Sequence, residues 1–434
     1  MSDRSRRWID ASLLLAVSIF AVSGARLVPF HPDETSWLYQ SRDLELLFSA
    51  PLSLAWRSEA EPTVEMDYRL LNAPLAKYVL GLGRLAAGFP SSSVAVDWSW
   101  SDDWKQNVAA GALPPERLLG AARTASAALL IPAMVALYFA GVTLRGRAAG
   151  LAAAILLGTN ALVLLHGRRA MAEGALTLGV ALATLGVLHA ARRPGLAGAA
   201  TALAFAAKTS AGVWIPIGLM AAVLPGGRRS RSWAGSLRRA AAYAASAVAV
   251  TVALHPVLWA NPPGALGAMW RARQDLVASQ VETTRRVMPW AVPATPAERA
   301  ATMIVHLFLA PVQFAEAANY LEQTAASEAA YLVVPGHELL RGVAGGAVML
   351  GLTVLGIGLA VARSRAAGLE ERRATAIALG TTAVQAAALV IAVPLAFQRY
   401  VIPLVPLVCL WGGVGATRVF EGLVARRSRG AGSR

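Results

Sequence analysis

Residues 28–40, VPFHPDETSWLYQ, stand at the end of a long apolar run that begins near residue 9. Two adjacent acids, Asp33 and Glu34, follow this run immediately. Acidic side chains are costly at a membrane surface unless they are solvated, paired or used in function. The stretch therefore predicts a membrane-spanning helix that leads directly into a functional acid pair.

The composition extends this interpretation to the whole chain. Of the 434 residues, 56% are hydrophobic and 15% are charged, and the mean hydropathy is +0.51. Soluble domains are about 45–50% apolar and about 25% charged, so the excess apolar surface must lie in lipid. The net charge of +15 fits arginine anchors on the cytoplasmic side of a membrane, and we expect no nucleic-acid partner. The single cysteine, Cys409, leaves no intrachain disulfide to support the extracytoplasmic parts.

Hydropathy predicts an all-α polytopic membrane protein with about ten transmembrane helices (10–12). The candidate spans lie near residues 9–29, 117–143, 148–165, 170–191, 196–209, 211–224, 240–258, 340–361, 374–393 and 401–419. Short arginine-rich segments alternate with them at 145–147, 191–195, 226–239, 363–373 and in the tail from 425. By the positive-inside rule, these segments and both chain ends are cytoplasmic.

The strong preference for arginine over lysine is typical of a GC-rich bacterium, so we expect the bacterial cytoplasmic (inner) membrane. An alternative for the first span stays open at this point. The sequence FAVSGA (20–25) also fits a signal-peptidase site, and cleavage there would leave the acid pair near a new N-terminus.

Two longer segments are expected outside the membrane, with short helices lying on its surface. The chain then divides into a module 1–265 that includes the first loop 30–116, a second loop 266–339, and C-terminal helices with a basic tail, 340–434. The segment 73–89 is apolar, but its crossing the membrane would reverse the orientation of every later arginine cluster. We therefore expect a juxtamembrane helix that Lys77 and Arg84 anchor to lipid. Tyr39 and the first-loop tryptophans fit interfacial anchors, with sugar stacking as the alternative.

Charged residues that fall on the outer side are exceptions to the positive-inside pattern. Three outer turns each carry cations, and the first turn also carries a histidine and an acid: His166, Arg168, Arg169 and Glu173 in LLHGRRAMAEGAL (164–176), Lys208 in AFAAKTSAG (204–212), and Arg399 in AFQRYVIPLVP (396–406). Each cation alone fits an anchor to lipid headgroups. Together with the acid pair, they predict a site in which cations bind a phosphate and a carboxylate removes a proton from a hydroxyl.

The acid pair is followed by DYRLLNAPLAKYVLGLGR (67–84), a run from RLLGAAR to RRAMAEG (117–174), LAGAATALAFAAKTSAG (196–212), LHPVLWANPPGAL (254–266) and QRYVIPLVP (398–406). This ordered set resembles the GT-C glycosyltransferases, in particular the carrier-lipid-dependent branch of protein O-mannosyltransferases and aminoarabinose transferases. The resemblance covers residues 1–265 and 395–420. It implies a GT-C bundle, a polyprenyl-phosphate sugar donor, a first-loop Asp near the catalytic centre and a membrane-facing donor groove.

The chain departs from the family pattern at two places. Asn72 and Ala73 stand where that branch has His and Pro, which weakens a specific assignment to protein O-mannosylation. Glu173 stands where many members have Asp, so a carboxylate is kept with one more methylene.

The function expected from residues and resemblance together is transfer of a sugar, a hexose or pentose with mannose among the candidates, to a hydroxyl of a protein, lipid or glycan. The acceptor meets the donor on the extracytoplasmic face among membrane lipids, in a single displacement with inversion. Asp33 is the expected general base and Glu34 the second choice, and Pro32 should break the helix so that Asp33 turns into the cavity. The expected phosphate-binding residues are Arg168, Lys208 and Arg399, then Lys77 and Arg169, with Glu173, His31, His166 and Tyr400 in support.

Two alternatives accompany this prediction. No cofactor is required, but Asp33, Glu34, Glu173, His31 and His166 could converge on a divalent metal, although their spacing matches no dedicated metal motif. The chain could instead be a transporter or flippase for an anionic or lipid-linked substrate, in which the charges form a substrate path. Transporters commonly show internal repeats and sites near the bilayer midplane, whereas here the charges gather at one face and no repeat is visible.

Overall fold

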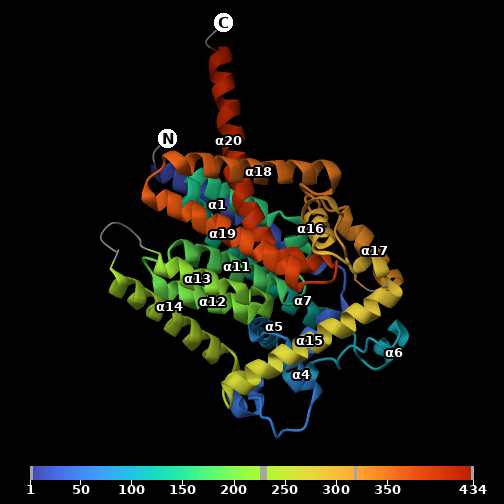
Figure 1. The fold of residues 1–434 in the computed structure, drawn as a ribbon. Helices are drawn as coiled ribbons and strands as arrows, with labels where there is room; N and C mark the ends of the chain where they lie inside the picture. The colour runs from blue at the N-terminus through green and yellow to red at the C-terminus, as the bar shows by residue number, and fades with distance from the viewer. Residues whose placement is uncertain (1–2, 225–231, 317–319, 432–434) are drawn as a thin grey trace.

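The computed structural model describes residues 3–224, 232–316 and 320–431. All regular secondary structure in these residues is helical, which confirms the predicted all-α class (Figure 1). The predicted inner segment 226–239 is described only from residue 232, and the last residues of the tail also lie outside the described residues. The helices are α1 (Asp3–Ser23), α2 (Pro32–Gln40), α3 (Asp43–Ser49), α4 (Val64–Leu71), α5 (Pro74–Ala86), α6 (Trp104–Ala109), α7 (Glu116–Ala128), α8 (Leu130–Arg145), α9 (Arg147–Gly158), α10 (Ala161–His166), α11 (Glu173–Leu188), α12 (Pro194–Ala207), α13 (Trp214–Val223), α14 (Trp233–Leu254), α15 (Pro262–Val287), α16 (Pro296–Ile304), α17 (Leu321–Leu332), α18 (Gly342–Ala366), α19 (Leu369–Ala392) and α20 (Val405–Ala431).

The apolar helices identify a multi-pass membrane protein. Among the described residues, six helices are long and apolar enough to cross a bilayer: Ser5–Leu27, Glu116–Arg145, Trp233–Leu254, Gly342–Ala366, Leu369–Ala392 and Gln398–Leu423. Four shorter apolar helices, Arg147–Gly158, Glu173–Leu188, Pro194–Ala207 and Thr209–Val223, correspond to the remaining predicted spans. The predicted span 148–165 is divided: α9 ends at Gly158, and Asn160 caps the start of α10 by accepting hydrogen bonds from the backbone N–H groups of Leu162 and Val163.

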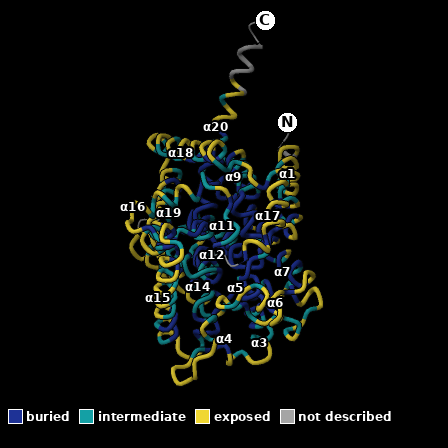
Figure 2. Tube along the Cα trace, turned by 90° about the vertical axis from the view of Figure 1, so that its right-hand side faces the viewer, coloured by how far each residue is buried: buried dark blue, intermediate teal, exposed yellow. Residues whose placement is uncertain are grey.

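The short helices α11 and α12 lie in the centre of the bundle, where the buried residues are concentrated (Figure 2). Small residues allow the surrounding helices to approach closely. A Cβ added to Gly356 of α18 would lie 1.9 Å from the carbonyl oxygen of Trp411 in α20, and one on Gly415 would lie 2.1 Å from that of Leu352. These two glycines therefore place α18 and α20 backbone to backbone, which is how packing stabilises helices in a membrane.

Both described chain ends lie at one end of the bundle, and the helices α3–α6 lie at the other (Figures 1 and 2). The helix α5 has 13 residues, or about 20 Å at 1.5 Å per residue, which is too short to cross the hydrocarbon core. The prediction that Lys77 and Arg84 anchor this helix to lipid is wrong. Lys77 is 1% exposed and Arg84 is fully buried, because Lys77 lies beside Asp43 and Arg84 pairs with Glu45 inside the first loop.

Candidate active site

The acid pair lies in the first turn of α2, and the HPDE sequence explains how the helix begins there. The Nδ1 atom of His31 accepts a hydrogen bond from the Asp33 N–H at 3.1 Å, and Glu34 accepts one from the His31 N–H at 3.1 Å. Pro32 occupies the first helical position, where its missing N–H costs nothing. The proline was predicted to break a helix, and it instead starts one. Successive helical residues are rotated by about 100°, so Asp33 and Glu34 point in different directions.

Glu34 is fully buried and fully hydrogen-bonded. One oxygen accepts from Arg123 Nε at 2.7 Å and from the Ala170 N–H at 2.8 Å, and the other accepts from Arg123 Nη2 at 2.6 Å and from His31. Burial raises the pKa of Glu34, but Arg123, Arg169 and the Ala170 N–H together lower it, and the net effect is a pKa below its usual value. Glu34 therefore ties α2 to α7 and to the turn after α10, and it has no oxygen left for a substrate.

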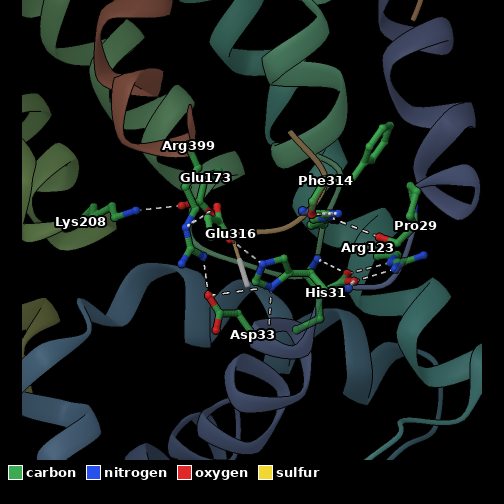
Figure 3. A network of polar contacts seen from close by, with 12 residues as sticks. Pro29, His31, Asp33, Arg123, Glu173, Lys208, Phe314, Glu316 and Arg399 are labelled. Atoms are coloured by element: carbon green, nitrogen blue, oxygen red, sulfur yellow. Dashed lines mark hydrogen bonds and ion pairs between the residues drawn. The ribbon is translucent and has the colours of Figure 1, made fainter. Parts of the chain in front are cut away.

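Asp33 points the other way, toward Arg399 and Glu316 (Figure 3). Its side chain is 22% exposed and accepts a hydrogen bond from Arg399, which lies in the short helix η9 (Gln398–Leu404). Glu316 lies 3.1 Å from Arg399 Nε and 2.8 Å from His31 Nε2. Burial raises the pKa of Asp33, whereas Arg399 and His31 lower it, and the net effect is a lowered pKa. Asp33 is therefore an ionised carboxylate with one side open.

An apolar groove begins beside this cluster. Its volume is about 510 Å³, and it lies between η4 (Thr209–Val213), α15, the end of α19 and η9. Its polar end carries Lys208, Arg273, Arg399 and Tyr400, while the rest of its wall is mainly apolar. Lys208 Nζ lies 2.8 Å from Glu173, 20% of the lysine side chain is exposed, and both Lys208 and Arg399 lie within 6 Å of the Tyr400 ring centre. Apolar wall residues include Leu70, Leu176, Phe205, Leu266, Met269, Trp270, Val277, Leu389, Val393 and Pro403.

The comparisons with known proteins concern the fold. No protein family and no curated protein matches the sequence. Among solved structures, ArnT from Cupriavidus metallidurans bound to undecaprenyl phosphate matches 96% of this chain at 14% identity and a TM-score of 0.50. The oligosaccharyltransferase of Archaeoglobus fulgidus matches 96% of it at 12% identity, also with a TM-score of 0.50. Both are GT-C glycosyltransferases. This chain has the GT-C fold.

The chain spans 61% of the ArnT chain and 51% of the oligosaccharyltransferase chain. At these identities the likeness extends to the fold alone. The predicted GT-C bundle is therefore confirmed as a fold, whereas the activity must be argued from the side chains.

The structure separates the predicted phosphate-binding cations. Lys208 and Arg399 border the groove, but Arg168 does not. Arg168 donates to the carbonyls of Ala21 and Phe20 at 2.7 Å each and contacts His337 at 2.8 Å, so it fixes the end of α1. Lys77 contacts the Tyr68 carbonyl at 3.1 Å in a separate cluster with Asp43.

Arg169 and His166 lie near the cluster with unused polar atoms. Arg169 donates to the carbonyls of Pro29 and Phe314, and its Nη1 atom is buried without a partner among the described residues. Within the same described set, both ring nitrogens of His166 and the Glu173 Oε2 atom are also buried and unpartnered. A buried polar group without a hydrogen-bond partner is costly. A polar ligand that supplied the missing partners would remove this cost.

Four residues of the site were missed from the sequence: Arg123, Arg273, Glu316 and Tyr320. Glu316 and Tyr320 belong to the second loop, and the Tyr320 ring lies 5.7 Å from the His31 ring. Interfacial anchoring is wrong for Trp98, which is 3% exposed and packs on Phe30 and Trp104. Arg123 ends the RLLGAAR stretch that carries part of the resemblance, but nothing in that stretch marks it as a partner of Glu34, and Glu316 lies in no motif.

The predicted metal ligands do not converge. Glu34 faces Arg123 and Glu173 faces Lys208, each away from Asp33. Within residues 3–224, 232–316 and 320–431, no group of three or more His, Cys, Asp or Glu side chains is arranged to hold a metal ion.

Proposed function

We propose that this protein is a membrane glycosyltransferase that moves a sugar from a polyprenyl-phosphate donor to a hydroxyl acceptor on the extracytoplasmic face of the bacterial cytoplasmic membrane. One observation carries the proposal: a long apolar groove ends in cations directly beside a half-buried, ionised carboxylate. The apolar groove suits an isoprenoid chain, the cations suit a phosphate, and the carboxylate suits removal of a proton from a hydroxyl.

The donor would bind with its isoprenoid chain along the groove and its phosphate at Lys208, Arg273 and Arg399. The volume of about 510 Å³ lies within the range of about 300–1,000 Å³ that is usual for ligand pockets. Arginine suits this role because its planar donors match phosphate oxygens in pairs. The solved ArnT structure, which has undecaprenyl phosphate bound, supports a lipid phosphate as the ligand class for this fold.

The transfer step follows from this placement. Asp33 accepts the proton of the acceptor hydroxyl as its oxygen attacks the anomeric carbon. The bond from that carbon to the phosphate oxygen breaks, and the polyprenyl phosphate leaves with one more negative charge. Arg399 and Lys208 stabilise this charge, an effect worth about 3–4 kcal/mol for a well-placed donor. One displacement inverts the anomeric centre, and no covalent enzyme intermediate forms.

Arg399 couples donor binding to the base. Its guanidinium contacts both Asp33 and Glu316. A donor phosphate competes for the same guanidinium, so its arrival weakens the hold of Arg399 on Asp33. Because that contact lowers the pKa of Asp33, the carboxylate becomes a stronger base when the donor is in place.

The orientation and the partners complete the proposal. The arginine-rich segments support a cytoplasmic location for both chain ends, and in that orientation the end of the bundle that holds Asp33 is extracytoplasmic. The sugar is a hexose or a pentose, and mannose belongs in the first panel of donors to be tested. The acceptor is a protein, lipid or glycan hydroxyl. The scheme uses only side chains of this chain, and we propose that no cofactor takes part.

The test is a transfer assay with the full chain in lipid nanodiscs. Undecaprenyl phosphates carrying labelled mannose, other hexoses and pentoses are offered together with envelope extracts as acceptors. We expect one donor to be consumed with release of undecaprenyl phosphate, and we expect Asp33→Asn to abolish transfer while donor binding is kept. Arg286→Gln, at an exposed ion pair on α15, is the matched control and should behave as wild type.

Two outcomes contradict the proposal. Transfer by Asp33→Asn at close to the wild-type rate removes Asp33 as the base. Failure of the wild type to consume any donor, together with movement of labelled lipid across the bilayer of reconstituted vesicles, favours a flippase instead.

A further inference from the structure

A second large pocket lies at the opposite end of the bundle from Asp33. Its volume is about 490 Å³, close to that of the donor groove. The pocket is formed by the turn between α8 and α9, the end of α11, the end of α18 and the start of α19. Because α11 begins at Glu173 and α19 ends beside the groove, the two sites stand at opposite ends of these helices. The 24 residues of α19 correspond to about 36 Å.

Arginines dominate the charged lining of this pocket. Four arginines and two acids line it: Arg145, Arg192, Arg363, Arg373, Glu370 and Glu371. The acids are already paired, since Arg192 lies 2.5 Å from Glu370 and Arg363 lies 2.8 Å from Glu371. The lining therefore carries a net positive charge, with donors left over for a ligand.

Arg373 provides a specific unused donor. Its Nη2 atom donates to the carbonyl of Ala221 at 2.7 Å, at the end of α13. Its Nε atom is buried and has no partner among the residues that the structure describes. Arg145 is also weakly held, since its nearest carboxylate, that of Glu421, lies 3.8 Å away. These atoms match the oxygens of a phosphate, which accept several charge-assisted hydrogen bonds at once.

The position of the pocket relative to the apolar spans indicates which kind of phosphate would reach it. Three full-length apolar spans begin or end at it: Glu116–Arg145, Gly342–Ala366 and Leu369–Ala392. The ends of spans mark the level of the lipid headgroups. Below the pocket, α18 presents exposed apolar side chains, such as Val348 at 53% and Val354 at 60%. A molecule with acyl chains against α18 thus has its headgroup at the arginines.

We propose that this pocket binds the headgroup phosphate of an anionic lipid from the leaflet opposite the donor groove. Basic pockets between transmembrane helices on the cytoplasmic side are suited to such headgroups. The site is separate from the proposed transfer reaction and does not depend on it. A bound lipid there would hold together the ends of α8, α11, α18 and α19. Two of these helices, α11 and α19, also line the groove through Leu176 and Leu389.

Native mass spectrometry of the full chain can test the site. The protein is incubated with dioleoylphosphatidylglycerol, dioleoylphosphatidylcholine or inorganic phosphate, and retained molecules are counted. We expect phosphatidylglycerol to be retained in preference to phosphatidylcholine. Arg145→Gln/Arg363→Gln should weaken this retention about tenfold or more, as expected for lost hydrogen bonds to a charged group. The control Arg286→Gln removes an exposed arginine of a similar ion pair elsewhere and should retain the lipid.

All variants, and the reference protein, carry Lys208→Met together with Glu173→Gln, which weakens phosphatidylglycerol binding at the donor groove without leaving Glu173 buried and unpaired. Equal retention in the double variant and in the reference protein overturns the proposal, as does equal retention of the two lipids. Displacement of phosphatidylglycerol by inorganic phosphate at the same concentration shows a free-anion site and overturns the lipid assignment. If the double variant does not fold, Glu371→Gln provides a second test: it frees Arg363 and should increase retention severalfold, and unchanged retention contradicts the proposal.

Discussion

Replacing Glu34 by Gln separates the two adjacent acids experimentally. The Glu34 carboxylate accepts four hydrogen bonds, two of them from Arg123. In Gln, one oxygen becomes an NH₂ group that faces two N–H donors, and the Arg123 guanidinium loses its counter-charge in a buried place. Breaking a buried ion pair from one side costs about 3–5 kcal/mol. We therefore expect Glu34→Gln to lower the free energy of unfolding by that amount.

The assay compares unfolding of the wild type, Glu34→Gln and Asp33→Asn in the same detergent, followed by tryptophan fluorescence. Asp33→Asn should destabilise the protein less than Glu34→Gln, because Arg399 keeps Glu316 as a partner. The double variant Glu34→Gln/Arg123→Met should be less destabilised than the sum of its single variants, since it no longer leaves a buried cation unpaired. A Glu34→Gln protein with wild-type stability and no transfer activity would refute this reasoning and make Glu34 the base.

Further predictions concern the groove, the pH profile, metal dependence and topology. Lys208→Met leaves Glu173 buried without its cation, so we pair it with Glu173→Gln and expect donor binding to weaken about 10- to 100-fold by titration, with the fold retained. Asp33 has a lowered pKa, so the wild-type transfer rate should be constant through neutral pH and fall only in acid. Arg399→Gln removes the main group that lowers this pKa, so the pKa should rise and the fall in rate should begin at a higher pH. An unchanged pH profile would show that Asp33 is not the titrating base. Treatment with EDTA should leave the transfer rate unchanged, and a loss restored by a divalent ion would disprove the metal-free scheme. A cysteine at exposed position Trp290 should react with an impermeant thiol reagent from outside and one at Ala366 should not; the reverse pattern would invert the proposed orientation.

The fold was predictable because apolar runs of span length are strong, local signals. All ten predicted spans correspond to apolar helical segments. The boundaries that differed depend on polar contacts, such as the Asn160 cap that divides one span into α9 and α10. The burial of Lys77 and Arg84 was not predictable either, because their partners Asp43 and Glu45 lie more than 30 residues away and carry no pattern that marks them.

The site was predictable in position and only partly in its members. Lys208 and Arg399, selected because their charges were expected on the outer side, both line one groove. Their role in binding a phosphate stays a prediction. Arg123 was missed because it lies in a mainly apolar segment, near the start of the predicted span 117–143, where nothing in the sequence indicates its partner. Glu316 was missed because the second loop has little periodicity, and only the folded chain brings it to 2.8 Å from His31.

Adjacent residues of the same type take different roles at two places in the site, for the same geometrical reason. Asp33 and Glu34 are consecutive in the first turn of α2, and Arg168 and Arg169 are consecutive in the turn after α10, so each pair diverges. In each pair, one residue uses every polar atom on the protein itself: Glu34 on Arg123, and Arg168 on the end of α1. The other keeps something unused, namely the open side of Asp33 and the Nη1 atom of Arg169. A ligand can bind only where an atom is unused, so Asp33 and Arg169, rather than their neighbours, are the members that should respond to a bound substrate.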